Sequence, residues 1–113
     1  MRHDPKVYIK YMLESIMLIQ EYTREVSRED FLGRTYLQDA VIRRLEIIGE
    51  AVKSLPPDFR ERHDEIPWQR IAGMRDVLIH EYFGVDLNLT WQTVQQDLPQ
   101  LRSRLEQVLQ QIG

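Results

Sequence analysis

Residues 40–55, AVIRRLEIIGEAVKSL, decide the fold class of this chain. Apolar side chains recur there at intervals of three and four, which places them on one face of a helix. We predict that this helix begins after a cap at Ser27, is interrupted near Gly33 and ends before the pair Pro56-Pro57. Its apolar stripe consists of Phe31, Leu37, Val41, Leu45, Ile48, Val52 and Leu55. The stretch therefore predicts an amphipathic helix that buries one face in a core.

Three further helices are predicted around this one. The first has Asp4 as its cap and Pro5 in its first turn. The third covers residues 68–82, WQRIAGMRDVLIHEY. The last covers about 88–112, where Pro99 must produce a kink or a break. No segment alternates with a period of two, so we predict an all-α, antiparallel bundle of four to five helices.

The composition narrows the classes of function. With 113 residues, the chain fits a single domain over 1–113. It has no cysteine, which excludes disulfides, thiolate nucleophiles and cysteine-ligated metals. We expect a cytoplasmic protein, because the first residues lack the apolar core of a signal peptide and no apolar stretch is long enough to cross a membrane.

The charged residues favour local rather than global recognition of phosphate. The net charge is −3, so no overall positive field attracts nucleic acid. Twelve of the fifteen basic residues are arginine, whose planar fork suits phosphate and carboxylate groups. A phosphate ligand would have to meet a local arginine cluster. The alternative is that these arginines form solvated ion pairs along the helices.

The segment RDVLIHEY, residues 75–82, combines apolar positions with Arg75, His80 and Tyr82, whose side chains can take part in a reaction. His80 can exchange a proton near neutral pH, whereas Arg75 stays charged and can stabilise phosphate oxygens. In a chain without thiols, this pair suits metal-free RNA cleavage, in which the ribose 2′-hydroxyl is the nucleophile. We expect neither a cofactor nor a metal ion.

Spacing alone leaves the geometry of this segment open. On a continuous helix, side chains five positions apart point about 140° away from each other, as Arg75 and His80 would. Either the helix ends near His80, or a second copy of the chain completes the site across a two-fold axis. Asp76 lies four positions before His80 and would orient its imidazole. The structural alternative is that these are ordinary helix-end residues with satisfied polar groups.

Three blocks of the sequence together resemble the HepT-like proteins of the HEPN superfamily, the toxins of HepT–MntA toxin–antitoxin pairs. The blocks are AVIRRLEIIGEAVKSL at 40–55, IPWQRIAGMRDVLIHEYFGVD at 66–86, and Trp91 followed by DLPQL at 97–101. They occur in the family's order over nearly the whole chain. The resemblance implies an HEPN-like bundle that forms a homodimer, with the R-x4-H-x-Y motifs of two subunits lining one cleft.

Activity, site residues and partner follow from the same resemblance. Arg75 and His80 would be the catalytic residues of a metal-independent endoribonuclease, with tRNA as one candidate among its RNA substrates. Tyr82 would accept AMP from a partner, an MntA-like minimal nucleotidyltransferase, as in a type VII-like toxin–antitoxin pair. The added bulk and negative charge would repel RNA phosphates. The family motif allows Asn or Asp after its arginine, here Asp76.

Arg43, Glu46 and Glu50 are spaced three and four apart, so they form one polar stripe on the second helix. The resemblance makes this helix a neighbour of the motif. We therefore expect Arg43 to hold RNA and either Glu46 or Glu50 to orient Arg75. Asp39 is a weaker candidate on the same grounds. The alternative is a ladder of ion pairs within the helix.

Two rival functions would use the same residues. In the first, the bundle is a non-catalytic companion of a nucleotidyltransferase, and Arg75 and His80 bind nucleotide or RNA phosphates without cleaving them. In the second, the bundle is a structural dimerisation module, and replacing His80 destabilises the fold as much as it alters any activity.

Overall fold

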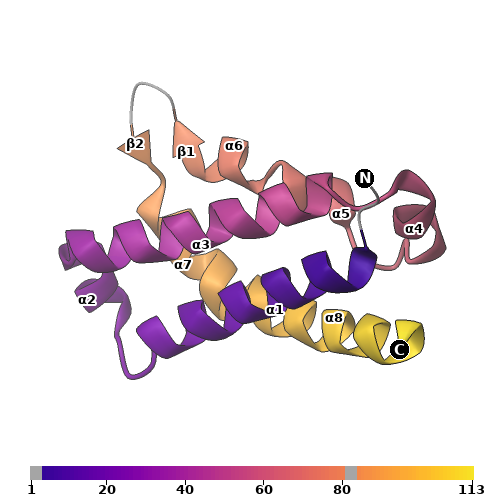
Figure 1. The fold of residues 1–113 in the computed structure, drawn as a ribbon. Helices are drawn as coiled ribbons and strands as arrows, with labels where there is room; N and C mark the ends of the chain where they lie inside the picture. Colours follow the sequence, from indigo (N-terminus) through magenta and orange to yellow (C-terminus); the bar gives the residue numbers. More distant parts are fainter. Residues whose placement is uncertain (1–3, 81–83) are drawn as a thin grey trace.

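The computed structural model describes residues 4–80 and 84–113, with the backbone alone at positions 75, 77, 79, 80 and 85 (Figure 1). In chain order the elements are α1 (Pro5–Tyr22), α2 (Arg28–Gly33), α3 (Thr35–Lys53), α4 (Pro57–Arg62), α5 (Trp68–Ala72), α6 (Met74–Leu78), β1 (Ile79–His80), β2 (Gly84–Val85), α7 (Leu87–Gln92), the π-helix η1 (Thr93–Asp97) and α8 (Leu98–Ile112). Helices dominate, which confirms the predicted all-α fold. No helix within the described ranges is long and apolar enough to cross a membrane.

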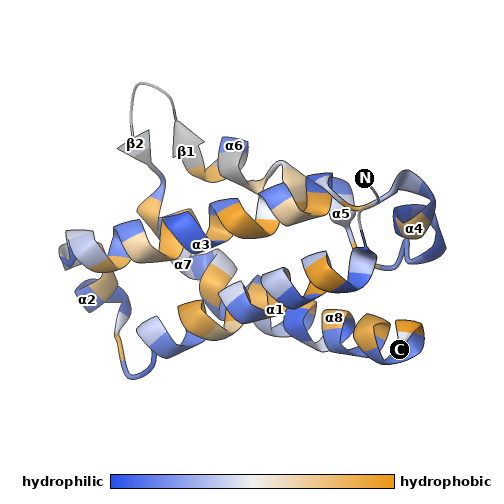
Figure 2. Ribbon diagram, viewed as in Figure 1, coloured by the Kyte–Doolittle hydropathy of each residue, from blue (hydrophilic) through white to orange (hydrophobic). Residues whose placement is uncertain are grey.

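The long helices α1, α3 and α8 enclose the core. α1 packs against both α3 and α8, and Figure 1 shows it lying alongside each of them. Figure 2 shows orange, hydrophobic stripes on these helices next to blue, hydrophilic ones. Every member of the apolar stripe predicted for the second helix is buried: Phe31, Leu37, Val41, Leu45, Ile48, Val52 and Leu55. The helical periodicity therefore identified the core face correctly.

The predicted beginnings of the first two helices are confirmed. Asp4 caps α1 and Ser27 caps α2, each through a side-chain oxygen that accepts a hydrogen bond from a backbone N–H at 3.0 Å. The predicted interruption near Gly33 also occurs, because α2 ends there and α3 follows after a single residue. α3 ends at Lys53, ahead of the two prolines.

The prediction of a continuous third helix over 68–82 is wrong. The segment divides at Gly73 into α5 and α6, and α6 ends at Leu78. The backbone then forms β1, which pairs antiparallel with β2. The N–H of Asp86 donates a hydrogen bond to the carbonyl of Leu78 at 2.7 Å and holds the chain where the helix stops. Gly84, at φ +80°, adopts a left-handed conformation that glycine tolerates at no steric cost.

The predicted irregularity near Pro99 is a π-turn within a helix and not a break. The segment 88–112 runs through α7, η1 and α8 without a gap, and the junction residues Gln92, Thr93, Asp97 and Leu98 keep right-handed helical backbone angles. Pro99 lies in the first turn of α8, where a helix makes no use of the missing N–H. The wider π-turn of η1 lies immediately before this proline and connects α7 to α8.

Candidate functional site

The part of the R-x4-H-x-Y motif from Arg75 to His80 lies where α6 gives way to β1. Arg75 and Asp76 belong to α6, and His80 belongs to β1, where it pairs with Gly84. The helix therefore ends between Arg75 and His80, so the angle expected for a continuous helix does not apply. The side chains of Arg75 and His80, and the whole of Tyr82, lie outside what the structure describes. Their roles stay predictions.

Asp76 is exposed on α6. The spacing of four that placed Asp76 and His80 on one helix face does not apply, because α6 ends at Leu78. The orientation of His80 by Asp76 stays a prediction.

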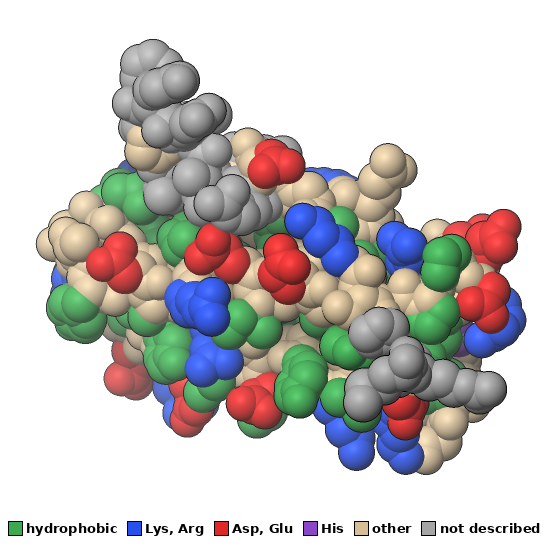
Figure 3. Space-filling model, turned by 45° about the horizontal axis from the view of Figure 1, so that its top comes forward, with side chains coloured by type: hydrophobic (Ala, Val, Ile, Leu, Met, Phe, Trp, Pro, Cys, Tyr) green, Lys and Arg blue, Asp and Glu red, His purple; other side chains and the backbone are tan. Residues whose placement is uncertain are grey.

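The motif helix α6 packs against α3, α5 and α7. Figure 1 shows α6, β1 and β2 along one side of α3. Figure 3 turns this side forward and shows acidic and basic side chains interspersed over it. The motif backbone thus lies on a surface of mixed charge and not on a uniformly basic one.

A hollow of about 360 Å³ opens on α3 beside the start of α7, and we call it the α3 hollow. Its lining residues are Gln38, Asp39, Ile42, Arg43, Glu46 and Leu87. Arg43 and Glu46 therefore border one concave surface, as their spacing on the helix predicted. Asp39, the weaker candidate, borders it as well.

Glu50 lies apart from this hollow. It borders a second hollow of about 250 Å³, which residues of α1 and α3 line. Its carboxylate is 3.5 Å from the Nζ of Lys53, and both side chains are exposed. Such exposed pairs contribute little to stability. The predicted contact of either Glu46 or Glu50 with Arg75 stays a prediction.

Sequence reasoning missed Gln38 and Leu87 as members of the site. The Gln38 amide nitrogen donates to the carbonyls of Phe31 and Leu32 at 2.9 and 3.1 Å, which ties the end of α2 to α3. Leu87 begins α7 directly after Asp86, whose N–H is bonded to the end of α6. Helical spacing could have suggested Gln38 as a neighbour of the polar stripe, whereas no local pattern points to Leu87.

The chain matches the protein-family model described as "Ribonuclease HepT-like". The match covers residues 12–108, which include the motif and every residue of the α3 hollow. No solved structure matches the chain.

Curated relatives match over almost the whole chain. "Gamma-glutamylcyclotransferase and putative RNase" of Methanocaldococcus jannaschii is 52% identical over 99% of this chain, which spans only 50% of that relative. "Probable ribonuclease HepT" of Thermococcus cleftensis is 51% identical, over 96% of this chain and 98% of the relative. A "Putative RNase" of Caldanaerobacter subterraneus is 45% identical, over 94% of this chain and 95% of the relative.

Proposed function

The chain belongs to the HepT-like ribonuclease family, and on that premise we propose that it is a metal-independent endoribonuclease, the toxin of a type VII-like toxin–antitoxin pair. One observation carries the proposal: the helix that bears Arg75 packs against α3, on which Arg43 and Glu46 border one hollow. A guanidinium at that place can hold an RNA phosphate, and a carboxylate can hold a catalytic arginine in position.

In the proposed reaction, the ribose 2′-hydroxyl attacks the adjacent phosphorus, and the bond to the 5′-oxygen of the next nucleotide breaks. His80 either takes the proton of the 2′-hydroxyl or gives one to the leaving 5′-oxygen. Arg75 stabilises the negative charge on the phosphorane oxygens. The products are a 2′,3′-cyclic phosphate and a free 5′-hydroxyl, so this step consumes no water.

Tyr82 is the proposed point of control. A partner MntA-like nucleotidyltransferase transfers AMP from ATP to the phenolic oxygen and releases pyrophosphate. The new phosphodiester carries a negative charge two positions from His80 in the chain. Its charge repels RNA phosphates and its bulk occupies space beside the cleavage site, so modification silences the enzyme.

We predict that the purified chain cleaves single-stranded RNA in the presence of EDTA. His80→Ala and Arg75→Ala should each lower the cleavage rate by at least about 100-fold, because each removes a group that acts on the reacting atoms. Arg62→Ala is the matched control, since Arg62 forms an exposed ion pair with Asp58 on α4, and it should keep the wild-type rate. Circular dichroism checks that each variant is folded.

Intact RNA after incubation with wild-type protein, with Tyr82 shown by mass spectrometry to be unmodified, would contradict this proposal and favour the non-catalytic companion. The proposed homodimer is tested in the same assay. If each site is built from two subunits, mixed dimers of Arg75→Ala and His80→Ala chains should recover part of the activity. No recovery in verified mixed dimers would mean that each chain keeps its own pair.

A further inference from the structure

The α3 hollow has the size and lining of a pocket for a flat polar group. Its volume of about 360 Å³ falls within the range of small-ligand pockets. Ile42 and Leu87 supply a partly buried apolar wall, and Arg43 is exposed at the same hollow. An apolar wall beside acceptor oxygens and one cation suits a nucleobase that remains attached to its phosphate.

Three lining residues, Gln38, Asp39 and Glu46, carry hydrogen-bond acceptors, and the first two are considered for the base. The Gln38 amide nitrogen donates to the carbonyl oxygens of Phe31 and Leu32, so the Oε1 of Gln38 is the amide atom left for a ligand. The next residue, Asp39, has an exposed carboxylate, which can only accept when ionised. The hollow therefore favours a ligand edge that presents donors.

The four bases differ in the donors that their Watson–Crick edges present. Guanine carries two adjacent donors, the N1–H and the 2-amino group. Adenine and cytosine each set one amino group beside a ring nitrogen that accepts, and uracil has one N–H between two carbonyl oxygens. An acceptor oxygen of the protein that faces an acceptor of the base forms no hydrogen bond, and it loses the hydrogen bond that it made to water. Two acceptors that border one hollow, such as those of Asp39 and Gln38, thus match guanine best.

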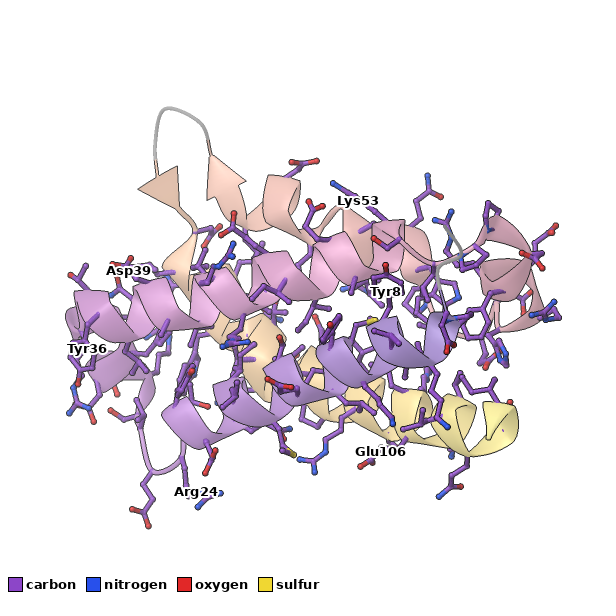
Figure 4. All side chains as sticks on the ribbon, viewed as in Figure 1. Tyr8, Arg24, Tyr36, Asp39, Lys53 and Glu106 are labelled. Carbon is purple, nitrogen blue, oxygen red and sulfur yellow. The ribbon has the colours of Figure 1, made fainter. Side chains whose placement is uncertain are left out.

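The hollow is connected to the cleavage motif through the backbone. Leu87 follows Asp86, whose N–H is bonded to the carbonyl of Leu78, two positions before His80. Figure 4 shows Asp39 on the side of α3 that faces β2. Carboxylates repel phosphate, so a neutral base is the part of RNA that can enter, while Arg43 can hold the adjoining phosphate.

We infer that the α3 hollow is a base-recognition subsite that selects guanine in a nucleotide next to the cleaved bond, with Asp39 and Gln38 as the specificity-determining residues. The position beside the cleaved bond rests on the proposed ribonuclease function. The preference for guanine is a binding property and can be measured without cleavage.

The test is fluorescence anisotropy with three labelled RNA pentamers, AAGAA, AAIAA and AAAAA, where I is inosine. Inosine differs from guanosine only in lacking the 2-amino group. Binding is measured with full-length His80→Ala protein, so that the RNA stays intact. We expect Kd for AAIAA and AAAAA to be on the order of tenfold weaker than for AAGAA. In the His80→Ala protein that also carries Asp39→Asn, most of this difference in Kd should disappear.

Asp58→Asn on α4 is the matched control, because it makes the same chemical change at an exposed position of another helix, and it should keep the guanine preference. Equal affinity for all three pentamers, or a preference that survives Asp39→Asn, would overturn the inference. The two proposals can fail separately. If the protein prefers guanine but the wild type does not cleave RNA, only the proposed ribonuclease function is contradicted. If the wild type cleaves RNA without a preference for guanine, only the proposed base subsite is contradicted.

Discussion

Ser15 places a hydroxyl in the core without a hydrogen-bond partner among the described residues. The residue lies on α1 and is 1% exposed. A buried hydroxyl that makes no hydrogen bond costs about 1–3 kcal/mol, and Ala has a higher helix propensity than Ser. We predict that Ser15→Ala raises the free energy of unfolding by about 1 kcal/mol, as measured by urea denaturation.

The control for this substitution is Ser103→Ala, at an exposed position of α8. This substitution changes helix propensity without removing a buried polar group, so it should raise the free energy of unfolding by about 0.5 kcal/mol or less. A loss of stability in Ser15→Ala would show that the hydroxyl is hydrogen bonded in solution and would contradict the prediction.

Residues of the candidate site could be predicted from the sequence only where they share one helix. Arg43 and Glu46 border the same hollow because a spacing of three fixes their relative direction on α3. Leu87 could not be predicted, since its place depends on how α7 packs against α2 and α6. The roles of Arg75 and His80 come from family resemblance and not from spacing.

At the scale of elements, Gly49 lies where α3 approaches the backbone of α5. A Cβ atom at this position would lie 3.5 Å from the carbonyl oxygens of Ile71 and Ala72, which is ordinary van der Waals contact. Gly49→Ala should therefore fit and raise the free energy of unfolding by up to about 1 kcal/mol through helix propensity. Gly49→Leu should lower it by about 1–3 kcal/mol, because the longer side chain crowds α5.

Thermal unfolding followed by circular dichroism measures both changes. Gly33→Leu is the control for the size of the side chain, because a Cβ at Gly33 meets nothing within 4 Å. Gly33→Leu should not lower the free energy of unfolding as Gly49→Leu does. A stable Gly49→Leu protein would mean that α3 and α5 pack less closely than the structure shows, and an unstable Gly49→Ala protein would mean that they pack more closely.

The elements also show why the helix over 68–82 was predicted wrongly and the irregularity near Pro99 correctly. Val77, Leu78 and Ile79 are apolar in sequence, and so short a run fits a helix or a strand equally well. The end of α6 depends instead on the bond from Asp86 to Leu78, which joins separate segments. Pro99 acts through its own covalent geometry, so an irregular turn near it could be predicted locally.

At the scale of the whole molecule, the bundle could be predicted because three long helices carry clear apolar stripes, and these stripes are buried against one another. The net charge of −3 means that RNA binding has to depend on local arginines rather than on a global field. Subunit pairing and recognition by a partner nucleotidyltransferase depend on contacts between chains, which the helical pattern of one sequence does not specify.

The most direct test of RNA cleavage by the 2′-hydroxyl is the chemistry of the cut ends. An RNA oligonucleotide is incubated with the wild-type chain in EDTA and compared with the same oligonucleotide carrying one 2′-deoxy nucleotide on the 5′ side of the cleaved bond. Mass spectrometry identifies the products. We predict 2′,3′-cyclic phosphate ends from the all-ribose strand and no cut at the 2′-deoxy position. A cut at that position, or products with 5′-phosphate ends, would contradict the mechanism.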